Sequence, residues 1–226
     1  MKTILPILLI LLMIGGYFYF SKKSKDTSNT SNPTASAPEI EGQEISKDFQ
    51  GSFVFSAEES TAKWTGSKKI IKDYYDTGTI KIKSGLATFE NGTVQSGEIV
   101  FDMTSISGET TSNTKAPVTK LTDHLKSEDF FNVEKYPTAT YKVISSEKTN
   151  DGYTLMGELT LTGKTAPLNV DIVTATENGN AIIAGVANID RSKWDIKYGS
   201  DSFFDDLGDN VINDMFTLEF KVVAKP

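Results

Sequence analysis

The stretch DGYTLMGELTL, residues 151–161, decides the fold class of this chain. It begins with Asp151-Gly152, a pair that tolerates the positive φ angles of tight hairpin turns. Apolar and polar residues then alternate, so that one face of an extended strand carries Tyr153, Leu155, Gly157, Leu159 and Leu161. Alternation of this length is typical of a half-buried antiparallel strand. The stretch therefore predicts a strand that follows a turn.

The same alternation recurs on both sides of this stretch. Further runs lie at 79–83, 98–103, 168–172 and 212–222, and Asn91-Gly92 and Asn178-Gly179 each separate two runs. The order strand, turn, strand continues for about eight to ten runs, which predicts an all-β, antiparallel domain. Such a meander ends as a sandwich or as a closed barrel, and closure removes the exposed strand edges.

One segment interrupts the period of two. Residues 116–126 place Val118, Leu121, His124 and Leu125 at helical spacing, with Pro117 at a position that the first turn of a helix tolerates. The segment connects the strand that ends near Met103 to the next run, near Thr138. It predicts a short helix, which in a barrel would cap one mouth.

The amino terminus predicts a membrane anchor. Residues 4–20 contain no charge, and a helix of this length spans roughly 26 Å, just short of the hydrocarbon core of a bilayer. No small-residue cleavage site follows, so we predict an uncleaved signal anchor at 1–20, with a cleaved signal peptide and a buried helix as alternatives. The lysines, one before the segment and three after it, by themselves favour the carboxy-terminal side inside.

A linker is predicted between this anchor and the strands. Residues 21–48 are rich in Ser, Thr, Asn, Pro and Ala and contain almost no large apolar side chain. Such a composition cannot bury enough apolar surface to fold by itself. The chain is thus divided into an anchor at 1–20, a disordered linker at 21–48 and a β domain at 49–226.

Composition excludes several classes of function. The formal net charge of −7 disfavours nucleic acid and anionic surfaces as partners. The chain has no cysteine, which excludes disulfides, thiolate metal sites and cysteine nucleophiles. It has one histidine and no G-x-S-x-G, P-loop or dinucleotide motif, and its aspartates at 201–214 lack the spacing of an EF-hand loop. We therefore expect no catalytic residue, metal site or cofactor.

Two unique residues and the aromatic clusters remain as candidates for ligand contact. His124 lies on the apolar side of the predicted helix, where a packing role is favoured over a ligand contact. Arg191 provides a rigid fork that lysine cannot, which suits a buried ion pair or, as the weaker alternative, an anionic head group. The aromatic residues could form the core or line a cavity; they are Phe130, Phe131, Trp194, Tyr198, Phe203 and Phe204.

Several motifs, in order along the chain, resemble the YceI family of bacterial proteins. The clearest is HLKSEDFFNVEKYPTATY at 124–141, and the others are GELTLTGKT at 157–165, DRSKWDIKYG at 190–199, LGDNVI at 207–212 and the strand at 99–106. The resemblance covers roughly residues 52–224. It departs from the family at 75–78, where Tyr-Asp-Thr-Gly replaces a stretch that often has a histidine before a glycine.

The resemblance implies a lipocalin-like, antiparallel, eight-stranded β-barrel, exported across the inner membrane, with a cavity for a polyisoprenoid or similar lipid. On that basis we expect a single-pass membrane protein whose barrel lies on the periplasmic or cell-surface side and binds a long-chain, quinone-like or polyisoprenoid lipid. A homodimer is possible. The alternative is a structural or interaction protein of the envelope with a filled barrel. By strand parity on the family stretches, the expected ligand-binding residues are Trp64, Phe101, Met103, His124, Phe130, Phe131, Tyr141, Leu159, Arg191 and Trp194.

Overall fold

The computed structural model describes residues 40, 42–113 and 117–226. The predicted anchor at 1–20 and most of the predicted linker lie outside the described residues. In the described part of the chain, no helix is long and apolar enough to cross a bilayer.

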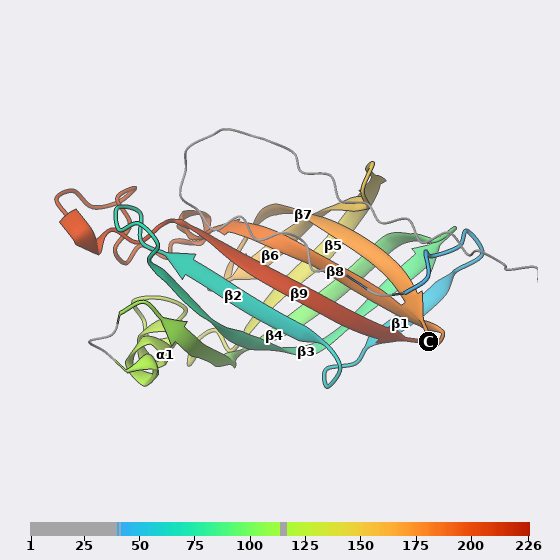
Figure 1. Ribbon diagram of the computed structural model, residues 1–226, viewed down its shortest axis with the longest axis horizontal. Helices are drawn as coiled ribbons and strands as arrows, with labels where there is room; N and C mark the ends of the chain where they lie inside the picture. Colours follow the sequence, from blue (N-terminus) through green and yellow to red (C-terminus); the bar gives the residue numbers. More distant parts are fainter. Residues whose placement is uncertain (1–39, 41, 114–116) are drawn as a thin grey trace, which may run out of the picture. The chain divides into compact units, whose positions relative to one another are not determined.

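The described domain is all-β with one short α-helix, as the alternation predicts (Figure 1). The strands and helices, in order, are β1 Gly51–Phe55, β2 Thr61–Ser67, β3 Tyr75–Glu90, β4 Thr93–Thr111, α1 Val118–Lys126, β5 Thr138–Lys148, β6 Tyr153–Leu161, β7 Lys164–Glu177, β8 Asn180–Asp190, the 3₁₀ turns η1 Arg191–Trp194 and η2 Gly208–Asn210, and β9 Met215–Lys225.

The strands form one antiparallel sheet that closes on itself. Its order is β1-β3-β2-β9-β8-β7-β6-β5-β4, and the additional pairings of β3 with β4 and of β1 with β9 close the sheet into a ring. β1 and β2 both pair with β3 and with β9, β1 near Val54 and β2 near Trp64, so together they fill one position of the ring. The nine strands thus occupy eight positions, which confirms the expected eight-stranded barrel.

The turns explain much of this meander. Asn91-Gly92 and Asn178-Gly179 form the predicted tight turns, with φ of 50° and 75° in the first and 52° and 82° in the second. A third two-residue turn is Thr162-Gly163, with φ of 51° and 78°. Threonine rarely adopts positive φ, so the sequence does not predict a tight turn at this position. Asp151-Gly152 belongs instead to a four-residue connection, in which the amide of Thr149 donates to the carbonyl of Gly152.

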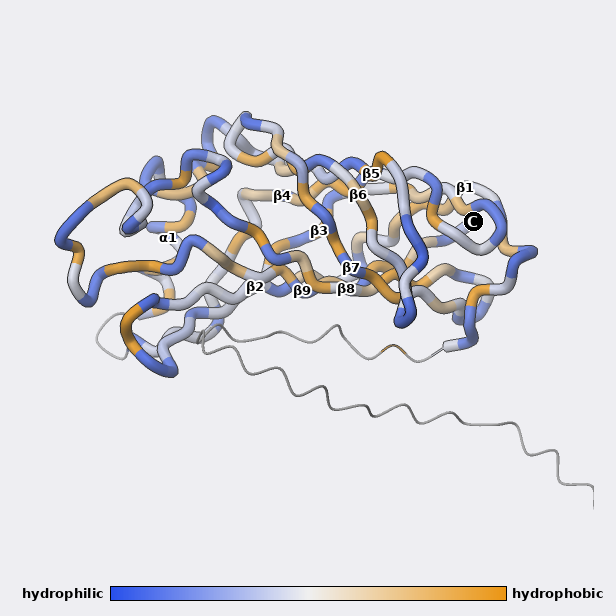
Figure 2. The backbone as a smooth tube through the Cα atoms, turned by 90° about the horizontal axis from the view of Figure 1, so that it is seen from above, coloured by the Kyte–Doolittle hydropathy of each residue, from blue (hydrophilic) through white to orange (hydrophobic). Residues whose placement is uncertain are grey.

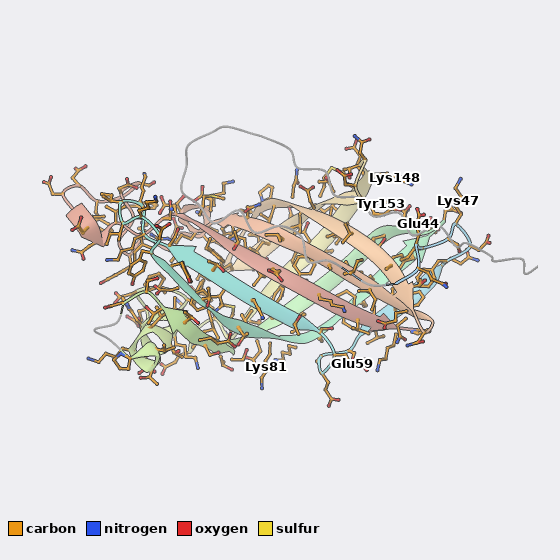
Figure 3. All side chains as sticks on the ribbon, in the orientation of Figure 1. Glu44, Lys47, Glu59, Lys81, Lys148 and Tyr153 are labelled. Carbon is orange, nitrogen blue, oxygen red and sulfur yellow. The ribbon has the colours of Figure 1, made fainter. Side chains whose placement is uncertain are left out.

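The interior follows the predicted parity. Ile80 and Ile82 of β3, Phe101 and Met103 of β4, and Leu159 of β6 are all buried. Figure 2 shows apolar positions along the strands, whereas the charged side chains of Lys81, Glu59 and Lys148 point away from the barrel in Figure 3.

One end of the barrel, which we call the narrow end, is closed by aromatic side chains. The ring of Phe49 stacks on Phe53 at 4.6 Å between centroids and meets Phe89 edge-on at 5.2 Å. Gln43, from the last part of the predicted linker, exchanges backbone hydrogen bonds with Thr176 at the end of β7. Glu44 and Lys47 lie at this end in Figure 3.

The opposite, wide end is covered by α1, as the interrupted pattern predicts (Figure 1). The helix begins at Val118, directly after Pro117. It packs on β4 at Gly108, whose amide donates to Oγ1 of Thr122 at 2.9 Å. A Cβ at Gly108 would lie 2.9 Å from a methyl group of Val118, so glycine permits this close approach.

Arg191 fixes the long connection between β8 and β9. Its guanidinium donates hydrogen bonds of 2.8–3.1 Å to four backbone carbonyls, those of Ile196, Tyr198, Ile212 and Asn213. Its Nη2 also lies 3.3 Å from Oδ1 of Asp214, in an ion pair without hydrogen-bond geometry. Burial lowers the pKa of Arg191, and the negative charge of Asp214 opposes that shift. The structural role predicted for this arginine is what the structure shows.

Replacement of Arg191 by methionine should lower the free energy of unfolding by about 3–5 kcal/mol, because it leaves four carbonyls without their buried donor and Asp214 without its counter-ion. Urea unfolding of residues 40–226, which contain the whole ring of strands, measures this change. Lys193→Met, at an exposed position of the same 3₁₀ turn, is the matched control and should change the stability by less than about 0.5 kcal/mol. Equal losses in both variants would refute this role of Arg191.

An added methyl group should have different effects on stability at two glycines that face the barrel interior. A Cβ on Gly78 would lie 1.8 Å from the carbonyl oxygen of Ser107 and 2.6 Å from the ring of Trp64, whereas a Cβ on Gly66 meets nothing within 4 Å. Gly78→Ala should therefore destabilise the barrel by about 1–3 kcal/mol. Gly66→Ala should stay within about 0.5 kcal/mol of the parent in the same unfolding experiment. A neutral Gly78→Ala would contradict this packing.

Candidate ligand cavity

A cavity of about 420 Å³ lies inside the wide end of the barrel. Its volume is in the range of small-molecule sites. Its apolar lining comes from inward-facing strand residues and from the helical segment, and includes Trp64, Ile80, Phe101, Met103, Ile106, Leu121, Leu125, Phe130, Phe131, Ala139, Leu159, Leu161, Ile189, Phe216 and Leu218.

A second, smaller cavity of about 70 Å³ lies deeper in the barrel. Four side chains line both cavities: Phe101, Leu159, Ile189 and Leu218. The two cavities therefore adjoin at these four apolar side chains. Val94 and Val222 line the deeper cavity and are themselves buried. The two spaces therefore follow one another from the mouth toward the narrow end.

Tyr141 lines the deeper cavity. Its hydroxyl donates to the carbonyl oxygens of Leu155, at 3.2 Å, and Leu168, at 3.0 Å. Burial raises the pKa of Tyr141 above its ordinary value, so the ring remains neutral. A Cβ on Gly157 would lie 2.6 Å from this ring, which shows how closely Tyr141 packs against β6. With its hydroxyl satisfied by protein, Tyr141 offers a ligand mainly its apolar ring.

The structure brings eight of the ten expected ligand-binding residues together around the large cavity. These are Trp64, Phe101, Met103, His124, Phe130, Phe131, Leu159 and Arg191. Tyr141 lies at the deeper cavity. Arg191 reaches the lining, but the carbonyls already described take its donors, so the structure does not favour the head-group role weighed for it.

Trp194 lines neither of these cavities. It is fully buried, its indole Nε1 donates to the carbonyl of Leu159 at 2.9 Å, and its own carbonyl accepts from Thr162 Oγ1. The 3₁₀ turn η1 follows β8 directly, so the alternation of inward and outward side chains does not extend beyond Asp190, and a ligand contact of Trp194 stays a prediction from the sequence. Trp194 fastens this turn to β6.

His124 stands at the rim of the large cavity. Its Nε2 lies 3.1 Å from Oδ2 of Asp129, and its ring meets the rings of Tyr198 and Phe130 edge-on at 4.5 and 4.9 Å. Packing and a carboxylate contact both hold this ring. In the described residues, no group of three or more acidic or histidine side chains is placed to hold a metal ion.

The mouth also contains polar side chains that the sequence analysis missed, among them Lys68, Tyr74, Asp76 and Thr111. Asp76 has the same parity on β3 as the inward-facing Ile80 and Ile82, and this alternation is the one feature of the sequence that indicates an inward-facing Asp76. Burial raises the pKa of Asp76, while Thr111 and Lys68 oppose the shift. Burial also raises the pKa of Tyr74, and Asp76 adds to the shift. The arrangement is an apolar cavity with polar side chains at its mouth.

Gly66 leaves open space at this mouth. It pairs with Asp76 across β2 and β3, and it lines the large cavity. Because nothing lies within 4 Å of a Cβ built there, the space beside Asp76 is free for a ligand group.

Comparisons with known proteins agree with this architecture. The family model for the YceI-like domain matches residues 46–224. A UPF0312 protein of Yersinia enterocolitica, YE1254, is 44% identical over 48 residues, which are 21% of this chain and 25% of that protein. A UPF0312 protein of Yersinia pestis is 42% identical over 48 residues, with the same coverage. The match thus spans about a quarter of the length of these relatives.

Two solved structures give further comparisons. BcnA of Burkholderia cenocepacia superposes with a TM-score of 0.59 at 19% identity, over 76% of this chain and 99% of that one. A polyisoprenoid binding domain from Saccharophagus degradans gives a TM-score of 0.48 at 15% identity, over 76% and 97%. The likeness to BcnA shows the fold alone. Since the family model covers most of the sequence, this chain belongs to the YceI-like family.

Proposed function

We propose that this protein binds a long-chain apolar lipid, polyisoprenoid or quinone-like, inside its barrel and performs no chemistry on it. The observation that supports this most is the apolar cavity of about 420 Å³, which shares four apolar lining side chains with a second apolar pocket deeper in the barrel. Each buried methylene of a ligand would contribute about 0.8 kcal/mol before the costs of binding.

The ligand would enter with its apolar tail first. The deeper pocket is lined almost entirely by apolar side chains, and the aromatic cluster of Phe49, Phe53 and Phe89 closes the barrel beyond it. The polar side chains gather at the opposite end, where Lys68, Tyr74 and Asp76 line the mouth. A lipid with its tail toward the narrow end would place a hydroxyl or carbonyl head group beside them.

The location of the domain is also part of the proposal. We infer an extracytoplasmic barrel, held near the membrane by the uncharged segment at 4–20. The sequence of that segment, with lysines directly after it, supports a membrane anchor. A homodimer remains a prediction from the sequence alone.

The alternative function, an interaction protein of the envelope, assumed a filled barrel. The cavity in the wide half of the barrel is contrary to that assumption. We therefore place the lipid-binding function first.

Residues 40–226, expressed in bacteria and purified without detergent, should retain lipid. Native mass spectrometry should show a species heavier than the bare polypeptide, and organic extraction should release a lipid of the same mass difference. Bare polypeptide alone, with no recoverable lipid and no stoichiometric binding of an apolar fluorescent probe, would refute the proposal.

Gly66→Phe should weaken binding of the same probe at least tenfold, because its ring would occupy the open space at the mouth. Thr65→Phe adds a similar ring at the adjacent residue of β2, whose side chain points to the outside, and serves as the matched control. It should bind the probe within about twofold of the parent. Fluorescence titration measures both affinities, and urea unfolding confirms that both variants fold. Undiminished binding by Gly66→Phe would place the ligand elsewhere.

A further inference from the structure

Two connections at the wide end expose large apolar side chains, and we call them the tip loops. The first, residues 68–74 between β2 and β3, exposes Ile70 at 60%. The second, residues 195–214 between η1 and β9, exposes Phe203 at 40% and Phe204 at 49%. The sequence predicts the two phenylalanines in the core or in a cavity, but both are exposed and line neither cavity. Neighbouring exposed apolar side chains of this size commonly mark an interaction site.

The tip loops are joined to each other. Nζ of Lys69 lies 2.7 Å from Oδ2 of Asp201, and Nζ of Lys68 donates to the carbonyl of Asp209 at 3.0 Å. The backbone amide of Lys69 also donates to the carbonyl of Val211 at 3.1 Å. Figure 1 shows both loops at the end of the barrel that α1 covers, and Figure 2 shows hydrophobic stretches in loops at that end. The loops that carry the exposed side chains are thus joined at the same end of the barrel.

The same loops form part of the cavity mouth. Lys68 and Tyr74 line the cavity from the first loop, and Tyr198, Asn210 and Ile212 line it from the second. Ile70, Phe203 and Phe204 do not line it. The tip loops therefore have a lining part that faces the cavity and an apolar part that faces solvent beside it.

We propose that the tip loops dock the mouth of the barrel onto an uncharged bilayer surface, and that the lipid passes between bilayer and cavity there. The proposal rests on the proposed function, since it concerns how the same ligand enters. A long apolar chain that crossed water would expose its whole surface. Contact between the mouth and the bilayer removes that step, and phenylalanine and isoleucine are suited to shallow insertion at the interface.

The net charge of the tip loops indicates which kind of bilayer surface they can bind. Residues 68–74 and 195–214 together contain four lysines and seven aspartates, a net charge of −3. Such loops are repelled by anionic lipid, and two copies facing each other through them would repel as well. Nζ of Lys197 lies 5.1 Å from the centroid of Phe203, so its ammonium can reach lipid phosphates while that ring inserts. A zwitterionic bilayer is the partner that these loops fit.

The test uses residues 40–226 and vesicles of phosphatidylcholine. Flotation of ligand-free protein measures docking, and a pyrene-labelled long-chain alcohol placed in the vesicles reports the rate of transfer to the protein. The same alcohol, titrated in dilute form without vesicles, reports equilibrium affinity. The tip variant combines Ile70→Ser, Phe203→Ser and Phe204→Ser. The matched control replaces exposed apolar residues of the barrel wall, Val54→Ser, Leu86→Ser and Ile144→Ser, whose exposures are 62%, 48% and 61%.

The tip variant should float at least tenfold less and accept the alcohol at least tenfold more slowly, with equilibrium affinity within twofold of the parent. The wall variant should retain docking and transfer rate, and vesicles with phosphatidylglycerol should bind the parent less. Normal docking and transfer by a folded tip variant, or equal losses in both variants, would overturn the proposal. So would a dimer, formed without vesicles, that only the tip variant loses.

Failure of the proposed function gives a different result. In that case the alcohol would bind neither the parent nor any variant at equilibrium, while flotation would still depend on Ile70, Phe203 and Phe204. That result would support membrane docking by the tip loops and would refute the transfer of a lipid into the cavity.

Discussion

Closure of the barrel is the constraint on which the rest of the structure depends. The 16 residues of β3 and the 19 of β4 complete the ring, so that the sheet has no free edge. Closure also turns every second side chain toward one enclosed space, which in an eight-position barrel is either filled or holds one ligand. This chain does both: aromatic rings pack the narrow end, and the wide end keeps its cavity.

Much of the fold follows from local rules. Alternation placed the strands and their inward faces, and Asn-Gly pairs located two turns, because both patterns act within a few residues. The sharing of one ring position by β1 and β2 did not follow from them, since it depends on the lengths of β3 and β9. The turn at Thr162-Gly163 was hidden because the barrel imposes a backbone angle that threonine by itself disfavours.

The site was predictable as far as strand parity holds. Phe101, Met103 and Leu159 lie where alternation places them, and Trp194 does not, because a 3₁₀ turn ends the alternation before it. The polar side chains at the mouth were less predictable from the sequence. The alternation places Asp76 on the inward face of β3, but a carboxylate is not expected in an apolar core. Its pairing with Gly66 and Thr111 in the folded barrel shows that it borders the cavity.

The structure holds the connection between β8 and β9 with a side chain, where other domains use a covalent bridge. Arg191 binds carbonyls on both sides of that connection, and the chain contains no cysteine. The shape of the mouth is therefore independent of the thiol redox state of its surroundings. Such a domain needs no oxidative folding enzymes, and it keeps the same opening under reducing conditions as under oxidising ones.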